Sequence, residues 1–525
     1  MPGGIASPRS FILRSLSACD DRMTKIHLSV GDVLSAREEA RPPGFVAMVL
    51  LRCFGGPVRA VLAFSLLAVS TFSQTLRADE TVRDDRVGVC THFSQNWSPD
   101  LVMPLIAKSG AGWIRDDFNW SALEPSPGNY RIPTKARAWI QAARAAGLKV
   151  DVILAYGNWA YPDHYDTAAY AKAAGWLAHE LANDVQAIEI LNEPNNFGFR
   201  DAYGGQWNGN ERLGSVSPYL QKYAQILNAA AKEIKLTNPK MTVIGLGTPP
   251  PASFRMIALG LVPQVDGLTD HPYGRDMPEV VPYANNPYFL LRDGIATADA
   301  NGTFASQVSM FRAQAKKYDA TEKLWHTEWG YSTQRSKSGK PVISEDTQAV
   351  YILRRLLESE AIGVEHTFVY DFKDDGADLY SNEQNFGLIH NDLSAKPSFF
   401  ALQRVTSTLA GMSVAAKAKQ ATIELDPAAK PGRLGNRCYT FSSSDGATSV
   451  VAFWDVKPWD PNAEPTNATI AVPVTGEARH IFLYDLLSGK QTEISDKLSQ
   501  NVSNRDGRIS IPVSLTAVPQ LLIVR

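Results

Sequence analysis

The sequence predicts an α/β barrel of eight parallel strands, a (β/α)8 fold, followed by a C-terminal antiparallel β-sandwich. The first observation behind this prediction is a strand, loop and helix pattern that repeats from about residue 86 to about residue 410. The second is a change after Gly411, where helical periods stop and short alternating runs begin. A chain of 525 residues is also too long for one ordinary compact domain. We therefore expect a barrel over residues 79–410 and a sandwich over residues 411–525.

Short apolar runs and helical periods alternate through the barrel region. Helix stops at Ala146-Gly147 and Ala361-Ile362-Gly363 are followed directly by strands. The predicted strands are Val87–His92, Trp113–Phe118, Lys149–Leu154, Ala187–Leu191, Thr242–Leu246, Gly267–Asp270, Leu324–Glu328 and Val364–Tyr370. The clearest predicted helices are Thr134–Ala146, Thr167–Leu181, Pro218–Leu236, Ser306–Tyr318, Glu345–Ala361 and Ser398–Leu409.

The C-terminal region is punctuated by Gly, Asp, Asn and Pro, which is typical of turns between antiparallel strands. Its predicted strands are Ala421–Leu425, Cys438–Ser442, Ser449–Trp454, Ala468–Pro473, His480–Tyr484, Arg508–Pro512 and Gln520–Val524. Within the barrel, the long segment Arg275–Thr303 follows the sixth strand and contains several Pro and Asn residues. We expect it to be a loop at the carboxyl end of the barrel.

An apolar run near the N-terminus predicts a secretory signal peptide over residues 48–78. Arg52 and Arg59 precede the apolar stretch Val61–Val69, and Ala78 supplies a small residue for cleavage. We assign residues 1–47 to an upstream start codon or a disordered leader, and we expect export to the periplasm or the cell exterior. An uncleaved membrane anchor is the alternative, but the run is short for a bilayer. No second apolar run follows, so we expect no stable membrane insertion after cleavage, and a monomer.

Charge and cysteine content exclude several classes of protein. The formal net charge is −2, which argues against a nucleic-acid partner because such proteins carry a basic excess. The four cysteines, Cys19, Cys53, Cys90 and Cys438, form no CxxC or Cys/His cluster, so a zinc site is not expected. A bridge between Cys90 and Cys438 stays open for an exported protein.

No sequence feature calls for a cofactor or a metal. A Gly-rich phosphate loop and a serine nucleophile elbow are both missing from the sequence. The pairs Asp116-Asp117 and Asp374-Asp375 invite a metal interpretation, but no spacing matches a calcium-binding loop. We interpret them as solvated or salt-bridged carboxylates.

Two of the predicted strands end in glutamates that carry the chemistry. Glu193 follows the run Ile188-Glu189-Ile190-Leu191, and Glu328 ends the run from Lys323 to Gly330. Side chains at the carboxyl ends of barrel strands converge on one face. Retaining glycoside hydrolysis needs a carboxylic acid and an ionised carboxylate about 5–5.5 Å apart on that face. Repulsion and local hydrogen bonding can separate the pKa values of such a pair.

Other polar and aromatic residues at strand ends suit the same site. We expect Arg115 to hold Glu328 ionised, Asn192 to donate to a sugar 2-hydroxyl, and Tyr273 to donate to the nucleophile. His271 is expected to contact sugar hydroxyls or the acid, and Tyr370 to form part of the sugar-binding floor. Structural packing or salt bridging is the alternative for each. Further candidates for the cleft are His92, Trp120, Asn158, Trp159 and Trp329.

These motifs resemble the clan A glycoside hydrolases. The resemblance rests on Asn192-Glu193-Pro194 after the fourth strand and Thr327-Glu328-Trp329-Gly330 after the seventh. With His271-Pro272-Tyr273, the segment Lys396–Leu402 and the trailing sandwich, the chain is most similar to glycoside hydrolase family 39, especially to bacterial members that cut exopolysaccharide. The resemblance spans about residues 86–410 and implies Glu193 as acid/base and Glu328 as nucleophile. Many clan A enzymes place a tryptophan at the end of strand eight, whereas Phe368–Phe372 contains none.

The sequence therefore predicts an exported retaining glycosidase acting on a β-linked polysaccharide or oligosaccharide. A transglycosylase would use the same two glutamates, with an acceptor sugar in place of water. A catalytically silent glycan-binding protein is a third alternative, and the presence of both glutamates counts against it.

Overall fold

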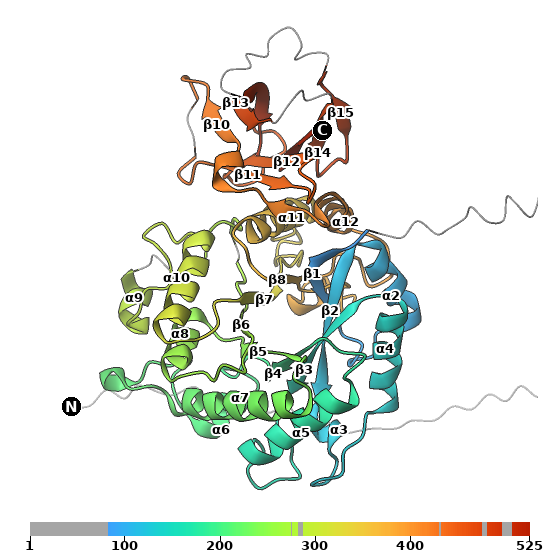
Figure 1. The fold of residues 1–525 in the computed structure, drawn as a ribbon, viewed down its shortest axis with the longest axis vertical. Helices are drawn as coiled ribbons and strands as arrows, with labels where there is room; N and C mark the ends of the chain where they lie inside the picture. Colours follow the sequence, from blue (N-terminus) through green and yellow to red (C-terminus); the bar gives the residue numbers. More distant parts are fainter. Residues whose placement is uncertain (1–81, 275, 282–286, 430–431, 475–479, 496–506) are drawn as a thin grey trace, which may run out of the picture. The chain divides into compact units, whose positions relative to one another are not determined.

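The structure, a computed structural model, describes residues 82–525 apart from 275, 282–286, 430–431, 475–479 and 496–506. Within the compact unit Glu80–Arg525 it confirms the predicted fold class, a closed eight-stranded barrel followed by antiparallel sheets (Figure 1). The predicted leader and signal peptide, with Cys19 and Cys53, lie outside the described residues. In the described part of the chain, no helix has both the length and the apolar character that crossing a membrane requires.

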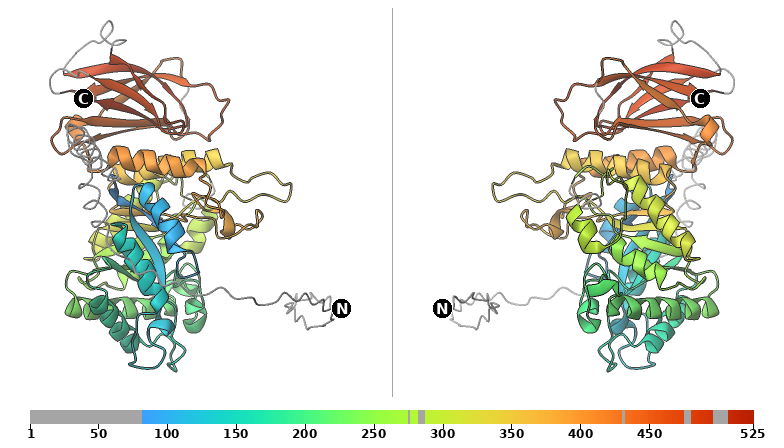
Figure 2. Two further views of the ribbon diagram at one scale, coloured as in Figure 1. Left: turned by 90° about the vertical axis from the view of Figure 1, so that its right-hand side faces the viewer. Right: turned by 90° about the vertical axis from the view of Figure 1, so that its left-hand side faces the viewer.

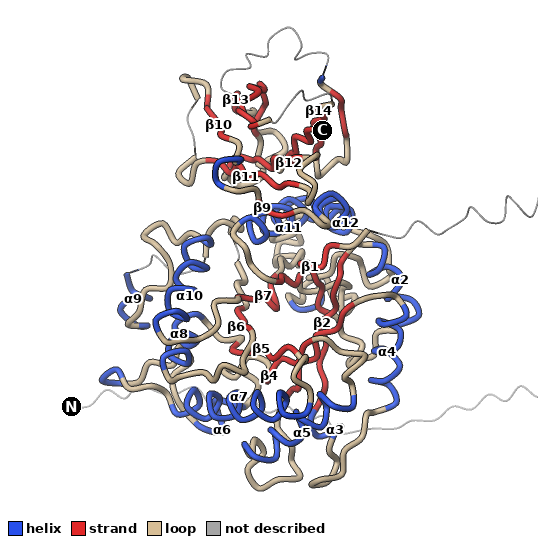
Figure 3. The backbone as a smooth tube through the Cα atoms, viewed as in Figure 1, coloured by secondary structure: helices blue, strands red, loops and turns tan. Residues whose placement is uncertain are grey.

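The barrel consists of eight parallel strands that pair in chain order, with β8 closing onto β1. Figure 3 shows the ring of strands surrounded by helices. The strands are β1 (Asp84–Cys90), β2 (Ala111–Asn119), β3 (Lys149–Ala155), β4 (Ala187–Ile190), β5 (Thr242–Leu246), β6 (Gly267–Asp270), β7 (Leu324–Trp329) and β8 (His366–Val369). The helices are α2 (Pro99–Lys108), α3 (Trp120–Leu123), α4 (Thr134–Ala145), α5 (Thr167–Glu180), α6 (Phe199–Tyr203), α7 (Pro218–Thr237), α8 (Pro250–Ala258), α9 (Pro287–Asp293), α10 (Phe304–Lys317), α11 (Glu345–Ala361) and α12 (Pro397–Leu409). Each predicted strand and helix overlaps an observed one.

Aromatic side chains fill the barrel interior below the carboxyl ends of the strands. Trp113 and Trp325 meet edge to face with their ring centroids 5.6 Å apart, and Phe368 packs against both. Gly88 on β1 makes room for this layer, because a Cβ there would lie 2.4 Å from a ring carbon of Phe368. Since side chains close the interior, a ligand can enter only from the end of the barrel.

Turn glycines end two helices where the sequence predicted it. Gly147 after α4 and Gly363 after α11 have φ values of 69° and 73°, the left-handed region that glycine adopts without steric cost. Helices α2, α3, α6, α8 and α9 were not predicted. Proline lies within α2 and at the start of α8, and this residue masks a helical period. The segment Arg275–Thr303 is not entirely loop, because it contains α9.

The C-terminal region forms two antiparallel sheets that stack face to face (Figure 2). Strands β10 (Thr422–Leu425), β13 (Thr466–Pro473) and β16 (Arg508–Leu515) form the smaller sheet. The larger contains β9 (Ser413–Val414), β11 (Asn436–Ser442), β12 (Ser449–Asp455), β14 (Ile481–Asp485), β15 (Gln491–Glu493) and β17 (Gln520–Val524). Burial alternates along β16, which fits one face turned toward the partner sheet. Cys90 and Cys438 are both free thiols, so the bridge left open by the sequence does not form.

A buried ion pair joins the barrel to the sandwich. Arg354 on α11 is fully buried, and it donates from Nε and Nη2 to the two carboxylate oxygens of Glu279 at 2.7 and 2.5 Å. Trp454 on β12 donates from Nε1 to the same carboxylate at 2.7 Å, and the carbonyl of Lys457 accepts from Arg354 at 2.8 Å. Burial alone would raise the pKa of Glu279, but the Arg354 charge outweighs it and lowers the pKa.

Replacing Arg354 with methionine is expected to lower the free energy of unfolding by about 3–5 kcal/mol, because it leaves the buried Glu279 carboxylate without its counter-charge. The measurement is urea unfolding followed by tryptophan fluorescence. As the matched control, Arg137→Met removes a pair with Glu180 whose side chains are 43% and 37% exposed, and it should cost about 0–1 kcal/mol. Equal losses in the two variants would contradict a structural role for the buried pair.

Candidate active site

A cleft of about 1260 Å³ opens at the carboxyl ends of the barrel strands. Its walls include both strand-end glutamates, Glu193 and Glu328. The cleft is also lined by three residues of the long segment after β6, namely Asp276, Val280 and Val281. The remaining lining residues that matter below are His92, Arg115, Asp117, Tyr156, Asn192, Phe197, Tyr273, Gly330 and Tyr370.

The backbone after β4 turns sharply to present Glu193. Leu191 and Glu193 have φ values of 58° and 40°, which non-glycine residues rarely adopt. Two tyrosines from the surrounding helices brace this turn: Tyr170 Oη accepts from the Leu191 amide at 3.2 Å, and Tyr223 Oη donates to the Ile190 carbonyl at 2.8 Å. Packing of α5 and α7 thus holds an otherwise unfavourable conformation at Glu193.

An irregularity in β7 directs Glu328 into the cleft. The pairing of β7 with β8 shifts register between His326 and Trp329, and such shifts re-aim side chains next to functional sites. The prediction that Trp329 lines the cleft is wrong. Trp329 is 1% exposed in the core, and its Nε1 donates to Thr367 at 2.7 Å. Next to it, Gly330 allows the ends of β7 and β8 to meet, because a Cβ there would lie 1.8 Å from the Tyr370 carbonyl oxygen.

Arg115 on β2 connects three residues of the site. Its Nη1 donates to Glu328 at 2.7 Å and its Nη2 donates to Asn192 Oδ1 at 3.0 Å. Its Nε donates to Glu189, a buried glutamate within β4, at 2.6 Å. Burial would lower the pKa of Arg115, but the charges of Glu189 and Glu328 raise it well above its ordinary value. The guanidinium therefore stays positive and places a permanent charge beside Glu328.

The contact with Arg115 also orients the Asn192 amide. A guanidinium only donates hydrogen bonds, so the oxygen of Asn192 must face it and the NH₂ group must point the other way. On the opposite side of Glu328, Tyr273 Oη donates to Oε2 at 3.1 Å. Tyr370 packs edge to face against Tyr273 with the ring centroids 6.0 Å apart. Donors thus approach Glu328 from both sides, and Tyr370 lies on the wall beside them.

His271 lies behind the two glutamates and does not line the cleft. Its Nδ1 is 2.9 Å from Glu193 Oε1 and 3.6 Å from Glu328 Oε2, and an oxygen of each glutamate lies within 4.8 Å of the other. Its Nε2 is 3.0 Å from Thr327 Oγ1, which in turn donates to Glu189 at 3.1 Å. Because the hydroxyl has a single proton, it accepts from His271, and Nε2 carries a hydrogen.

One mobile proton consequently lies between His271 Nδ1 and Glu193. Burial would lower the pKa of His271, but the charge of Glu328 and the contact with Glu193 raise it. Burial would raise the pKa of Glu193, but the hydrogen bond and charge of His271 outweigh it and lower the pKa. The proton therefore favours the imidazole. The alternative, a neutral imidazole beside a carboxylic acid, differs only by moving this proton along one hydrogen bond.

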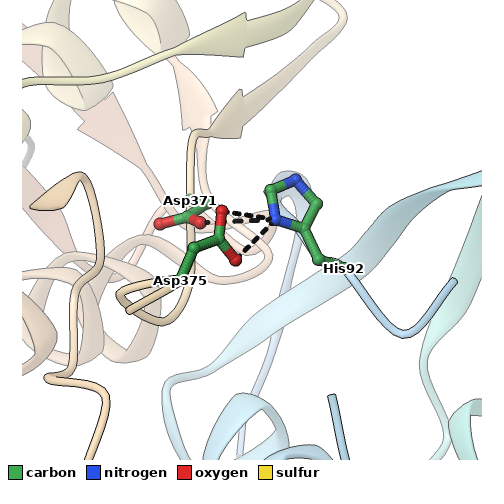
Figure 4. Close-up of side chains that lie close together, drawn as sticks. All are labelled: His92, Asp371 and Asp375. Atoms are coloured by element: carbon green, nitrogen blue, oxygen red, sulfur yellow. Dashed lines mark hydrogen bonds and ion pairs between the residues drawn. The ribbon is translucent and has the colours of Figure 1, made fainter. Parts of the chain in front are cut away.

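His92 belongs to a separate group at the edge of the cleft. Its Nδ1 donates to Asp375 at 2.8 Å, and Asp371 lies 3.8 Å from the same nitrogen (Figure 4). Trp97 Nε1 also donates to Asp375, at 3.0 Å. Burial would lower the pKa of His92, but the two aspartates raise it to about 9. His92, Asp371 and Asp375 each offer an atom that could coordinate a metal cation. The protonated imidazole of His92 already supplies a positive charge to the two aspartates, so an ion pair accounts for the geometry.

Three other predicted cleft residues lie elsewhere, and the structure corrects them. Trp120 is fully buried and donates from Nε1 to Glu124 at 2.7 Å. Asn158 is 1% exposed and donates to the Glu124 carbonyl at 2.8 Å. Trp159 is 78% exposed, and its ring packs at a tilt against His164. None of the three lines the cleft: Trp120 begins α3 directly after β2, and Asn158 and Trp159 lie in the loop after β3.

Sequence reasoning gave no role in the site to Glu189, Thr327, Tyr156 or Phe197, and it interpreted Asp117 only as a solvated or salt-bridged carboxylate. Glu189 carried a usable signal, because a charged residue within an apolar parallel strand must find a buried partner. Thr327 is likewise a polar residue within a buried apolar strand, β7, and also needs a hydrogen-bond partner there. Asp117 on β2, Tyr156 after β3 and Phe197 after β4 become neighbours only through the tertiary arrangement.

Comparison with solved structures shows the same fold. A family 39 glycoside hydrolase from the gut symbiont Bacteroides cellulosilyticus WH2 superimposes with a TM-score of 0.61 and 24% identity, covering 84% of this chain and 81% of that chain. A glucosidase from Croceicoccus marinus superimposes with a TM-score of 0.52 and 15% identity, covering 85% of this chain and 96% of that chain. No family model and no curated protein matches the sequence. The expected likeness to family 39 is therefore confirmed for the fold.

Proposed function

We propose that this chain is a retaining glycoside hydrolase that cleaves β-glycosidic bonds in a polysaccharide or oligosaccharide. The observation that carries the proposal is the placement of Glu193 and Glu328, with carboxylate oxygens within 4.8 Å of one another across the cleft. Retaining enzymes separate their carboxyl groups by about 5–5.5 Å, whereas inverting enzymes leave about 6.5–9.5 Å for a water molecule. The fold shared with known glycoside hydrolases supports the same assignment.

In the first step Glu328 is the nucleophile and Glu193 the acid. A Glu328 oxygen attacks the anomeric carbon while the bond from that carbon to the leaving oxygen breaks, and Glu193 gives its proton to the leaving oxygen. Arg115 and Tyr273, which contact opposite oxygens of Glu328, hold the carboxylate ionised and aimed. The proton held between Glu193 and His271 is the one that is transferred.

In the second step water replaces the leaving group. Glu193, now ionised, takes a proton from the water as it attacks the anomeric carbon, and the bond to Glu328 breaks. The Asn192 NH₂ group, which Arg115 turns away from itself, is oriented to donate to a sugar hydroxyl in both steps. A cleft of about 1260 Å³ exceeds the roughly 300–1,000 Å³ of ordinary small-molecule pockets, which favours a substrate of more than one sugar.

Trapping the glycosyl-enzyme tests the proposal. The protein is treated with a panel of 2-deoxy-2-fluoro-β-glycosyl fluorides (gluco, galacto, manno and xylo), and the labelled peptide is identified by mass spectrometry. We expect one label per chain, on Glu328, and the reactive reagent identifies the sugar at the cleaved bond. A label on a carboxylate other than Glu328 would overturn the assignment. So would the absence of a label with every reagent, if the protein also released no reducing ends from glycans.

A further inference from the structure

Two aromatic residues, Tyr156 and Phe197, line the cleft together with Glu193. We propose that Phe197 and Tyr156 form a stacking platform for the leaving-group sugar, with Asp117 accepting hydrogen bonds from its hydroxyls. This inference rests on the proposed function and names a part of the substrate that the two glutamates do not contact.

The two rings form one aromatic surface that the protein covers only in part: Tyr156 is half-buried and Phe197 is exposed. Tyr156 and Phe197 meet edge to face with their centroids 5.7 Å apart, and both line the cleft. Phe197 is 55% exposed, although covering such a ring would be favourable. A pyranose ring presents an apolar C–H face, which is the kind of surface that an exposed aromatic ring at a cleft can bury.

Both aromatic residues have an unusual backbone conformation. Tyr156 has a φ of 62° and Phe197 a φ of 52°, values that bulky residues seldom adopt. Strained backbone of this kind persists only where the surrounding structure enforces it, and it concentrates at binding sites. Two neighbouring rings with the same backbone strain on one cleft wall indicate that their positions serve a ligand.

The connection to Glu193 places this platform on the leaving-group side. Glu193 and Phe197 belong to one short turn, in which the Asn196 amide donates to the Glu193 carbonyl at 2.7 Å. Asn196 Nδ2 also donates to Glu193 Oε2, at 2.9 Å. Since the acid must contact the leaving oxygen, the surface tied to the acid faces the sugar that carries this oxygen.

Asp117 supplies the polar edge of the platform. Its Oδ2 accepts from Tyr156 Oη at 3.1 Å, which orients the carboxylate relative to the ring. Burial and then the neighbouring Asp116 raise the pKa of Asp117 to about 6, so it is ionised at pH 7 and accepts hydrogen bonds only. An acceptor beside an aromatic face matches a sugar ring, which has hydroxyls at its edge and C–H groups on its face.

The experiment compares substrates with and without a leaving-group sugar. Phe197→Ala, Phe197→Trp and the control Trp159→Ala are assayed with the β-glycosyl fluoride that matches the reagent labelling Glu328, and with β-linked oligosaccharides of that sugar. Fluoride is a single atom and does not reach the platform. Trp159 is also an exposed aromatic residue, but it does not line the cleft.

For Phe197→Ala we expect kcat/KM on oligosaccharides to fall about ten-fold or more, the scale set by burying one aromatic ring. Turnover of the glycosyl fluoride should stay within about two-fold of the unmodified protein, Phe197→Trp should restore oligosaccharide cleavage, and Trp159→Ala should change neither substrate. A parallel loss on both substrates, or no loss on either, would overturn the platform. Failure of the proposed function appears differently, as the lack of turnover and of label in the unmodified protein.

Discussion

Replacing Glu328 with glutamine is expected to reduce turnover by about 10⁴-fold or more, because the amide cannot form the covalent bond to the anomeric carbon. Folding should survive the change. Arg115 keeps Glu189 as a buried counter-charge at 2.6 Å, and the glutamine oxygen can still accept from Nη1. Substrate binding should therefore be largely retained while the chemistry stops. The measurements are release of reducing ends from a substrate polysaccharide, and isothermal titration with an oligosaccharide of that sugar.

The matched control is Glu365→Gln, an exposed glutamate that directly precedes β8 at the end of the barrel opposite the cleft. This variant should retain full activity and the same melting temperature. Substantial hydrolysis by Glu328→Gln, with the melting temperature unchanged, would remove Glu328 from the role of nucleophile. Another carboxylate would then have to act as the nucleophile.

Replacing Glu193 with glutamine is expected to slow cleavage by about 10²–10⁴-fold for substrates with poor leaving groups, because these need a proton from the acid. Activated aryl glycosides should lose much less in the first step, since their leaving group departs as an anion. The second step also lacks its base, so the glycosyl-enzyme should accumulate. Leaving-group dependence of kcat/KM, measured over a series of aryl glycosides, checks this expectation.

Adding azide separates the acid role from general damage to the site. Azide attacks without giving up a proton, so it should restore turnover of activated substrates by Glu193→Gln and yield the β-glycosyl azide. The same addition should leave Glu328→Gln inactive. Equal slowing of activated and poor substrates, with no effect of azide, would indicate that Glu193 has a different role.

Much of the fold was predictable because its signals are local. Runs such as Val152–Leu154 are apolar throughout, since parallel barrel strands are buried on both faces. Gly147 and Gly363 ended their helices as predicted. Helices α2 and α8 were missed because their prolines obscure the helical period, and β9 was missed because its two residues are too few to establish an alternation.

The sequence by itself determined the barrel, the sandwich and the pair of strand-end glutamates, because strand order and chain direction bring those ends together whatever the side-chain details. Only the tertiary structure decided which of the surrounding residues reach the cleft and which lie in the core. The register shift in β7 turned Glu328 toward the cleft and Trp329 into the core. Contacts between distant strands placed His271 behind the glutamates, and loops after β3 and β4 placed Tyr156 beside Phe197. Such outcomes depend on backbone angles and long-range packing, for which no residue pattern along the chain provides a local signal.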